Sequence, residues 1–131
     1  MIMRFVLALL CLASMSLYGQ MPNNAIPEIT RESFDSLVLK PQKIVIVEIY
    51  SELCPPCRAQ EKILSNLTAD LSQIEFAIYK VDKNAQPALA SNYGVNTTPT
   101  LLIFRNGRLV EKRVGFTSRQ TLLSLLNKIN G

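Results

Sequence analysis

The sequence predicts one α/β domain with a central mixed β-sheet flanked by helices on both faces, in the order β-α-β-α-β-α-β-β-α. Two observations carry this prediction. Apolar, β-branched segments alternate with helical patterns along the chain, and the last two strands flank Asn106-Gly107, a strong hairpin signal. The 131 residues are 48% hydrophobic and 18% charged, which suits one packed core and excludes a disordered chain.

The predicted elements follow one another from residue 25. A short strand at 25–29 precedes a helix at 31–39, which Thr30 can cap and Pro41 ends. The segment KIVIVEIY, 43–50, is apolar on both faces, as expected for a strand covered on both sides. The remaining elements are a helix at 57–71, a strand at 75–82, a helix at 87–93, strands at 100–105 and 108–114, and a helix from Ser118 to Ile129.

The first 19 residues have the order of a secretory signal peptide. Arg4 precedes a short apolar run, 5–12, and small residues follow it. The run is shorter than the roughly 20 residues that span a bilayer, and a buried helix of the domain is the alternative. We expect a signal peptide at 1–19, a linker at 20–27 and the domain at 28–131.

This segment also predicts the location of the protein. Export is expected, with the bacterial periplasm as the compartment. Membrane anchoring as a lipoprotein through Cys11 is not favoured, because that signal has a small residue before the cysteine and Leu10 stands there.

The composition excludes several classes of chemistry. The chain has no histidine, so it has no Ser-His-Asp or Cys-His catalytic pair and no imidazole metal ligand. The net charge of +4 is mild, and basic and acidic residues alternate along the chain, so nucleic acid is not an expected partner.

Two cysteines, Cys54 and Cys57, flank Pro55-Pro56 between the buried strand and the long helix. A helix N-terminus favours the thiolate, which is the reactive form of cysteine, and Cys54 lies closest to it. Cys57 lies one turn further on, close enough to attack a mixed disulfide formed on Cys54. The prolines suit the first helical turn and are expected to tune the redox potential.

Other interpretations of the cysteine pair remain open. A purely structural disulfide would close a tiny loop and stabilise the domain little. A zinc site would need further ligands, and attachment of haem would need a histidine where Arg58 stands.

Glu48 interrupts the apolar strand before the cysteines. Burial makes a carboxylate costly to ionise, which raises its pKa and suits it to carry protons. A structural glutamate, bridged by water or paired with a cation, is the alternative.

The run from Ile29 to Ile129 resembles thioredoxin and its exported relatives. The motifs that carry the resemblance are ITRESFD (29–35), VIVEIYSELCPPC (45–57), YGVNTTPT (93–100) and LLIFRNGRLV (101–110). The resemblance implies a thioredoxin fold and a thiol–disulfide oxidoreductase that cycles a Cys54–Cys57 pair between dithiol and disulfide.

The resemblance also implies roles for single residues. Cys54 matches the attacking cysteine and Cys57 the resolving one. Glu48 matches a buried acid that takes a proton from Cys57, and Lys80 matches a lysine near that acid. A solvated lysine at the end of a strand is the alternative for Lys80.

The expected substrate-binding residues are Pro55, Pro56, Thr98 and Pro99. In the family, the residue matching Pro99 is a cis-proline facing the active-site disulfide, and the backbone before it pairs with the extended substrate. Thr98 holds that backbone position here. An ordinary trans proline at the start of a strand is the alternative.

We expect the protein to reduce disulfides in protein substrates. An oxidase or isomerase, or a thioredoxin-fold binding module whose cysteines are incidental, are the alternatives. No cofactor or metal is expected, and the chain is expected to be a monomer. Its electron donor is unidentified, and a membrane reductase is what the family suggests.

Overall fold

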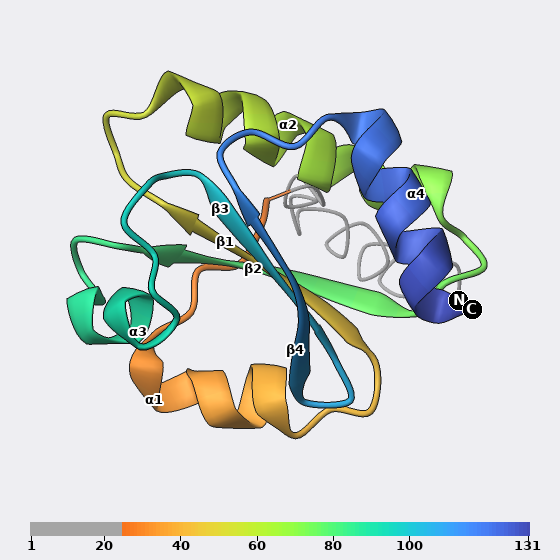
Figure 1. The fold of residues 1–131 in the computed structure, drawn as a ribbon, viewed down its shortest axis with the longest axis horizontal. Helices are drawn as coiled ribbons and strands as arrows, with labels where there is room; N and C mark the ends of the chain where they lie inside the picture. The colour runs from red at the N-terminus through yellow and green to blue at the C-terminus, as the bar shows by residue number, and fades with distance from the viewer. Residues whose placement is uncertain (1–24) are drawn as a thin grey trace, which may run out of the picture.

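A computed structural model describes residues 25–131 (Figure 1). The predicted signal peptide and most of the predicted linker lie outside the described residues. In chain order the elements are α1 (Arg31–Phe34), the short π-helix η1 (Asp35–Leu39), β1 (Ile44–Tyr50), α2 (Pro55–Asp70), β2 (Phe76–Asp82), α3 (Pro87–Asn92), β3 (Thr100–Arg105), β4 (Arg108–Val114) and α4 (Arg119–Asn130).

The four strands form one mixed sheet in the order β2-β1-β3-β4. β1 runs parallel to β2 and antiparallel to β3, and β4 returns antiparallel to β3 through the predicted hairpin. Every residue of β1 is buried, as its apolar sequence predicted. β1 is thus one of the two interior strands, and the residues just after it leave the sheet from its middle.

Helices cover both faces of the sheet, as predicted. α2 and α4 lie on one side and α1 and α3 on the other (Figure 1). Leu64 and Leu67 of α2 pack with Leu122 and Leu126 of α4 in one buried cluster. Phe34 belongs to a second buried cluster, which lies under α1 and α3. Within residues 25–131, none of the helices has the length and apolar character of a membrane span.

The beginning of the domain differs from the prediction in two places. The strand predicted at 25–29 is reduced to a single bridge between Glu28 and Lys80, held by hydrogen bonds from Ile29 N to Lys80 O and from Lys80 N to Pro27 O. Pro27 has no N–H, so it cannot donate a further hydrogen bond to the edge of β2. The helix predicted at 31–39 changes to π-helix at Asp35, where Lys40 N bonds to Asp35 O.

Candidate functional site

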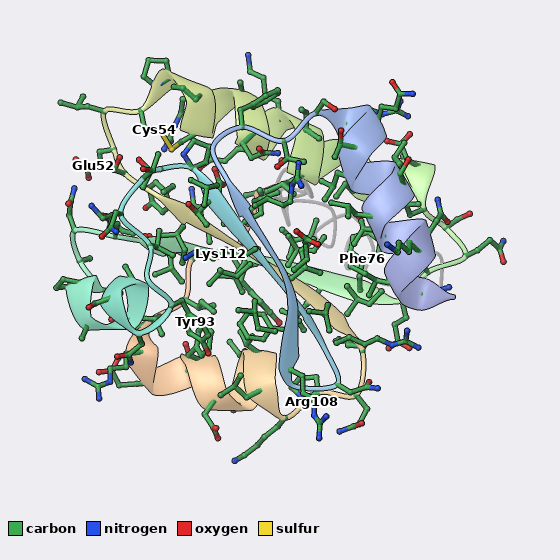
Figure 2. All side chains as sticks on the ribbon, in the orientation of Figure 1. Glu52, Cys54, Phe76, Tyr93, Arg108 and Lys112 are labelled. Carbon is green, nitrogen blue, oxygen red and sulfur yellow. A yellow bond between two sulfur atoms is a disulfide. The ribbon has the colours of Figure 1, made fainter. Side chains whose placement is uncertain are left out.

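The two cysteines lie at the first turn of α2, directly after β1 and its short loop. Figure 2 shows Cys54 at the N-terminal end of α2. Cys54 has extended backbone angles and caps the helix, while Pro55 and Pro56 occupy the first helical turn, as expected. Cys54 and Cys57 form a disulfide, and the N–H of Cys57 donates to Cys54 Sγ over 3.2 Å. A helix N–H therefore points at the sulfur that is expected to become a thiolate.

The two cysteines of the disulfide differ in exposure. Cys54 is 7% exposed and Cys57 is fully buried. Leu53, which precedes the pair, is 99% exposed. An attacking group can therefore reach Cys54 more easily than Cys57, and it must approach beside a protruding leucine side chain.

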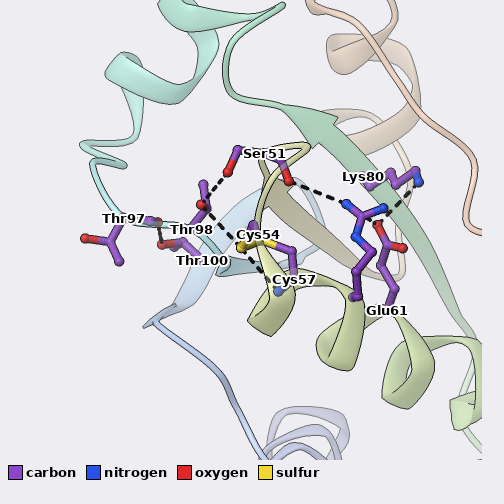
Figure 3. The surroundings of a disulfide bond; sticks show 9 residues. Ser51, Cys54, Cys57, Glu61, Lys80, Thr97, Thr98 and Thr100 are labelled. Atoms are coloured by element: carbon purple, nitrogen blue, oxygen red, sulfur yellow. Dashed lines mark hydrogen bonds and ion pairs between the residues drawn. A yellow bond between two sulfur atoms is a disulfide. The ribbon is translucent and has the colours of Figure 1, made fainter.

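The loop before β3 faces the disulfide (Figure 3). The Thr98–Pro99 peptide bond is cis, as the resemblance implied. The hydroxyl of Thr98 donates to Cys54 Sγ over 3.7 Å, and Thr98 Oγ1 lies 2.8 Å from the hydroxyl of Ser51. Two hydroxyl groups thus link the end of β1, the loop before Pro99 and the sulfur of Cys54.

Glu48 lies on β1 with no exposed surface. Neither of its carboxylate oxygens makes a hydrogen bond with any residue of 25–131. Burial is the main cause that raises the pKa of Glu48 to about 8; the negative charge of Glu61 adds to the rise, and Arg58 and Lys80 oppose it. The neutral, protonated acid is therefore the favoured form of Glu48 at neutral pH.

Lys80 lies beside Glu48, but its ion pair is with another residue. The two are direct partners in the parallel register of β1 and β2. The ammonium of Lys80 lies 3.3 Å from Glu61 Oε1 of α2, and Arg58 Nη2 lies 3.5 Å from the same oxygen (Figure 3). Lys80 is also 4.9 Å from the centroid of the Tyr50 ring. Lys80 is therefore a partly buried, paired lysine, not a solvated one.

Sequence reasoning missed several residues at this site. Glu61 follows Cys57 by four residues, so the helical spacing alone places it on the same face of α2. Arg58 precedes Glu61 by three residues, which is the spacing of an intrahelical ion pair. Ser51 had no comparable signal, because its partner Thr98 is 47 residues away in the sequence.

The fold and the site together define a class of protein. A mixed sheet flanked by helices carries a Cys-Pro-Pro-Cys disulfide at a helix N-terminus, facing the loop of a cis-proline, and the strand before the disulfide holds a buried carboxyl group. The disulfide can accept two electrons, and the helix N-terminus favours the thiolate that forms. This is the site of a thiol–disulfide oxidoreductase.

Comparisons with known proteins agree with this class. The family model for thioredoxin matches residues 25–128. The chain is 36% identical to a thioredoxin of Chlamydia pneumoniae over 100 residues, which cover 76% of this chain and 94% of that protein. It is 37% identical over 95 residues to a thioredoxin of Streptomyces clavuligerus, covering 72% and 87% of the two chains. The chain therefore belongs to the thioredoxin family, and it is a protein-disulfide oxidoreductase.

Proposed function

We propose that the protein is an exported reductase of disulfides in other proteins. In this proposal the Cys54 thiolate attacks a substrate disulfide, forms a mixed disulfide and releases one substrate thiolate. Glu48, in the ionised form that is the minor one at neutral pH, takes the proton of the Cys57 thiol, and the new thiolate attacks Cys54 Sγ. The second substrate thiolate then leaves. The substrate disulfide has gained two electrons, and the Cys54–Cys57 pair, which has lost them, is now a disulfide.

The accessibility of the two cysteines is the observation that carries these roles. Cys54 is the more exposed cysteine and accepts two hydrogen bonds at its sulfur, from the N–H of Cys57 and the hydroxyl of Thr98. Within residues 25–131, the backbone N–H and C=O of Thr98 make no hydrogen bond. They are thus free to pair with an extended substrate, as in strand addition.

Trapping of intermediates tests the proposed roles. Cys57→Ser leaves the attacking sulfur and removes the resolving one, so it should accumulate mixed disulfides with a disulfide-containing protein such as insulin. Cys54→Ser should accumulate none, and serves as the matched control. Failure of the Cys57→Ser protein to form an adduct, or equal trapping by both variants, would rule out this assignment.

Reduction is the proposed direction because the chain is similar to thioredoxins and has a proline, Pro56, directly before Cys57. The potential of the pair tests it. Thioredoxin itself lies at about −270 mV and the oxidant DsbA at about −120 mV. A value near the lower figure, measured in graded thiol buffers, supports a reductase. A value near the upper figure would reverse the direction and favour an oxidase or isomerase.

Export rests on the order of residues 1–19 alone. Expression of the full chain in a bacterium, followed by cell fractionation and mass measurement, tests it. A periplasmic protein shortened by about 16 to 19 residues supports a cleaved signal peptide. An uncleaved protein that stays in the cytosol would refute export. We further propose that the protein acts as a monomer and receives electrons from a membrane reductase.

A further inference from the structure

The strand register brings Lys80 next to the buried Glu48, yet an acid from another element binds the lysine. Glu48 and Lys80 are cross-strand partners on β1 and β2, so their side chains emerge on the same face of the sheet. Glu61 Oε1 of α2 accepts a hydrogen bond from the ammonium of Lys80 over 3.3 Å. The carboxylate of Glu48 has no hydrogen-bond partner among residues 25–131.

Glu61 holds a second cation in the same place. The guanidinium of Arg58 lies 3.5 Å from the Glu61 oxygen that also binds Lys80. Arg58 and Lys80 both lie over the ring of Tyr50, at 5.4 and 4.9 Å from its centroid. The Glu61 side chain is 19% exposed, so this pairing is partly shielded from water.

Among the groups of residues 25–131 that act on Glu48, Glu61 is the one acid. β3 presents Leu101, an uncharged side chain, opposite Glu48. On β1, the hydroxyl of Tyr50 is occupied by donating to Glu28 over 2.5 Å. α2 contributes Arg58 and Glu61, and β2 contributes Lys80.

We propose that Glu61 is a positioning residue for proton transfer at Glu48: it pairs with Lys80 and Arg58, keeps both cations away from the buried carboxyl group, and so keeps that group protonated near neutral pH. The inference deepens the proposed function, because it rests on Glu48 as the proton carrier for Cys57. The arrangement of Glu61 and Lys80 is nevertheless testable without any assay of turnover.

Two physical effects of Glu61 act in the same direction. Its negative charge repels the ionised form of Glu48 directly, which raises the pKa of Glu48. It also anchors the ammonium of Lys80, the nearest cation on the neighbouring strand. Replacing Glu61 by glutamine removes the repulsion and releases Lys80, so both changes should favour ionisation of Glu48.

Carbon-13 NMR of the glutamate carboxyl groups measures this effect in the oxidised, full-length protein. The Glu48 resonance is assigned by its absence in Glu48→Gln. In Glu61→Gln, the titration midpoint of Glu48 should fall by about one pH unit or more, given the size of nearby-charge effects. Glu52→Gln is the matched control: it removes the same charge from the loop before Cys54, where Glu52 is exposed and in no ion pair within residues 25–131. A midpoint in Glu61→Gln that is unchanged, higher or equal to that of the control would overturn the proposal.

A double-mutant cycle tests whether Glu61 restrains Lys80. Lys80→Met should raise the Glu48 midpoint more in the Glu61→Gln background than in the wild type, because released Lys80 then lies closer to Glu48. Equal shifts in the two backgrounds would refute the restraint. The rate at which Cys57 resolves mixed disulfides, measured against pH in Glu48→Gln, addresses the separate question of Glu48 as proton carrier. An unaltered pH profile there would refute the proposed function at Glu48, while the NMR result would still decide the role of Glu61.

Discussion

The side chain of Gln60 binds the backbone of Thr117 through both ends of its amide. Gln60 Nε2 donates to Thr117 O over 3.1 Å, and Thr117 N donates to Gln60 Oε1 over 2.8 Å. Gln60 has no exposed surface, and Thr117 is only 3% exposed. The pair therefore satisfies two buried backbone groups between β4 and α4, and ties that loop to the helix that carries the cysteines.

Gln60→Met should destabilise the domain. Methionine fills a similar volume but leaves the N–H and C=O of Thr117 buried without partners, at a cost of about 2–4 kcal/mol in the free energy of unfolding. Urea denaturation measures the change. Gln120→Met, at an exposed position of α4, should cost much less. Similar losses in the two variants would contradict the importance of the Gln60–Thr117 pair.

Glu48 should make stability depend on pH. Its pKa is raised from 4.5 to about 8 in the folded protein, so between these values the folded state keeps a proton that the unfolded state has lost. The unfolding free energy should therefore fall as pH rises from about 4.5 to 8, by at most about 1.4 kcal/mol per pH unit. Glu48→Gln should lack this dependence and be more stable than the wild type at pH 8. Urea denaturation of the oxidised proteins at pH 5 and 8 checks this, and parallel pH slopes would contradict it.

Thr98→Val should make Cys54 less reactive at low pH. The variant keeps the side-chain volume but removes the hydroxyl that donates to Cys54 Sγ. The pH of half-maximal alkylation of reduced Cys54 by iodoacetamide should rise by about 0.5 units, the effect of a weak hydrogen bond to sulfur. Ser51→Ala should give a smaller rise, since Ser51 contacts Thr98 and not the sulfur. Thr97→Val, at an exposed neighbour, is the control; an equal shift there would count against the hydroxyl.

Gly107→Ala should be far more costly than Gly115→Ala. Both glycines have left-handed backbones, with φ of +78° and +81°. A Cβ at Gly107 would collide with the carbonyl oxygen of Leu39, whereas a Cβ at Gly115 meets no atom within 4 Å. Backbone strain alone should cost about 1–2 kcal/mol at Gly115, and Gly107→Ala should lose at least about 2 kcal/mol more. Thermal denaturation compares them, and equal losses would show that the hairpin moves away from Leu39 without cost.

Most of the fold was predictable because its signals are local. The apolar run of β1, the Asn106-Gly107 turn and the Ser118 cap each lie within the element that they specify, and their predicted bounds agree with the structure within one or two residues. The strand predicted at 25–29 is reduced to one bridge. Its pairing depends on β2, which is distant in the sequence, and Pro27 has no N–H to donate to that strand. The change to π-helix at Asp35 has no signal that we recognise in the sequence.

The part of the site that was predictable also has local signals. The spacing of Cys54 and Cys57 and the charge of Glu48 within an apolar strand are visible in short segments. The position of Lys80 beside Glu48 agrees with the resemblance, but its ion pair with Glu61 depends on how α2 packs over β2. Tertiary packing decides which of two nearby acids a lysine binds, and strand patterns carry no information about that choice.

The burial of Glu48 gives this chain an unusual buffering property. No side chain among its 131 residues is a histidine, the residue that ordinarily supplies buffer capacity between pH 5 and 8. Glu48, with its pKa near 8, is therefore a side chain of this chain that titrates close to neutral pH while Cys54 and Cys57 are joined and cannot titrate. Potentiometric titration of the oxidised protein, with Glu48→Gln as the blank, should count a single proton. The titration thus measures the ionisation of the buried Glu48 side chain without an added probe.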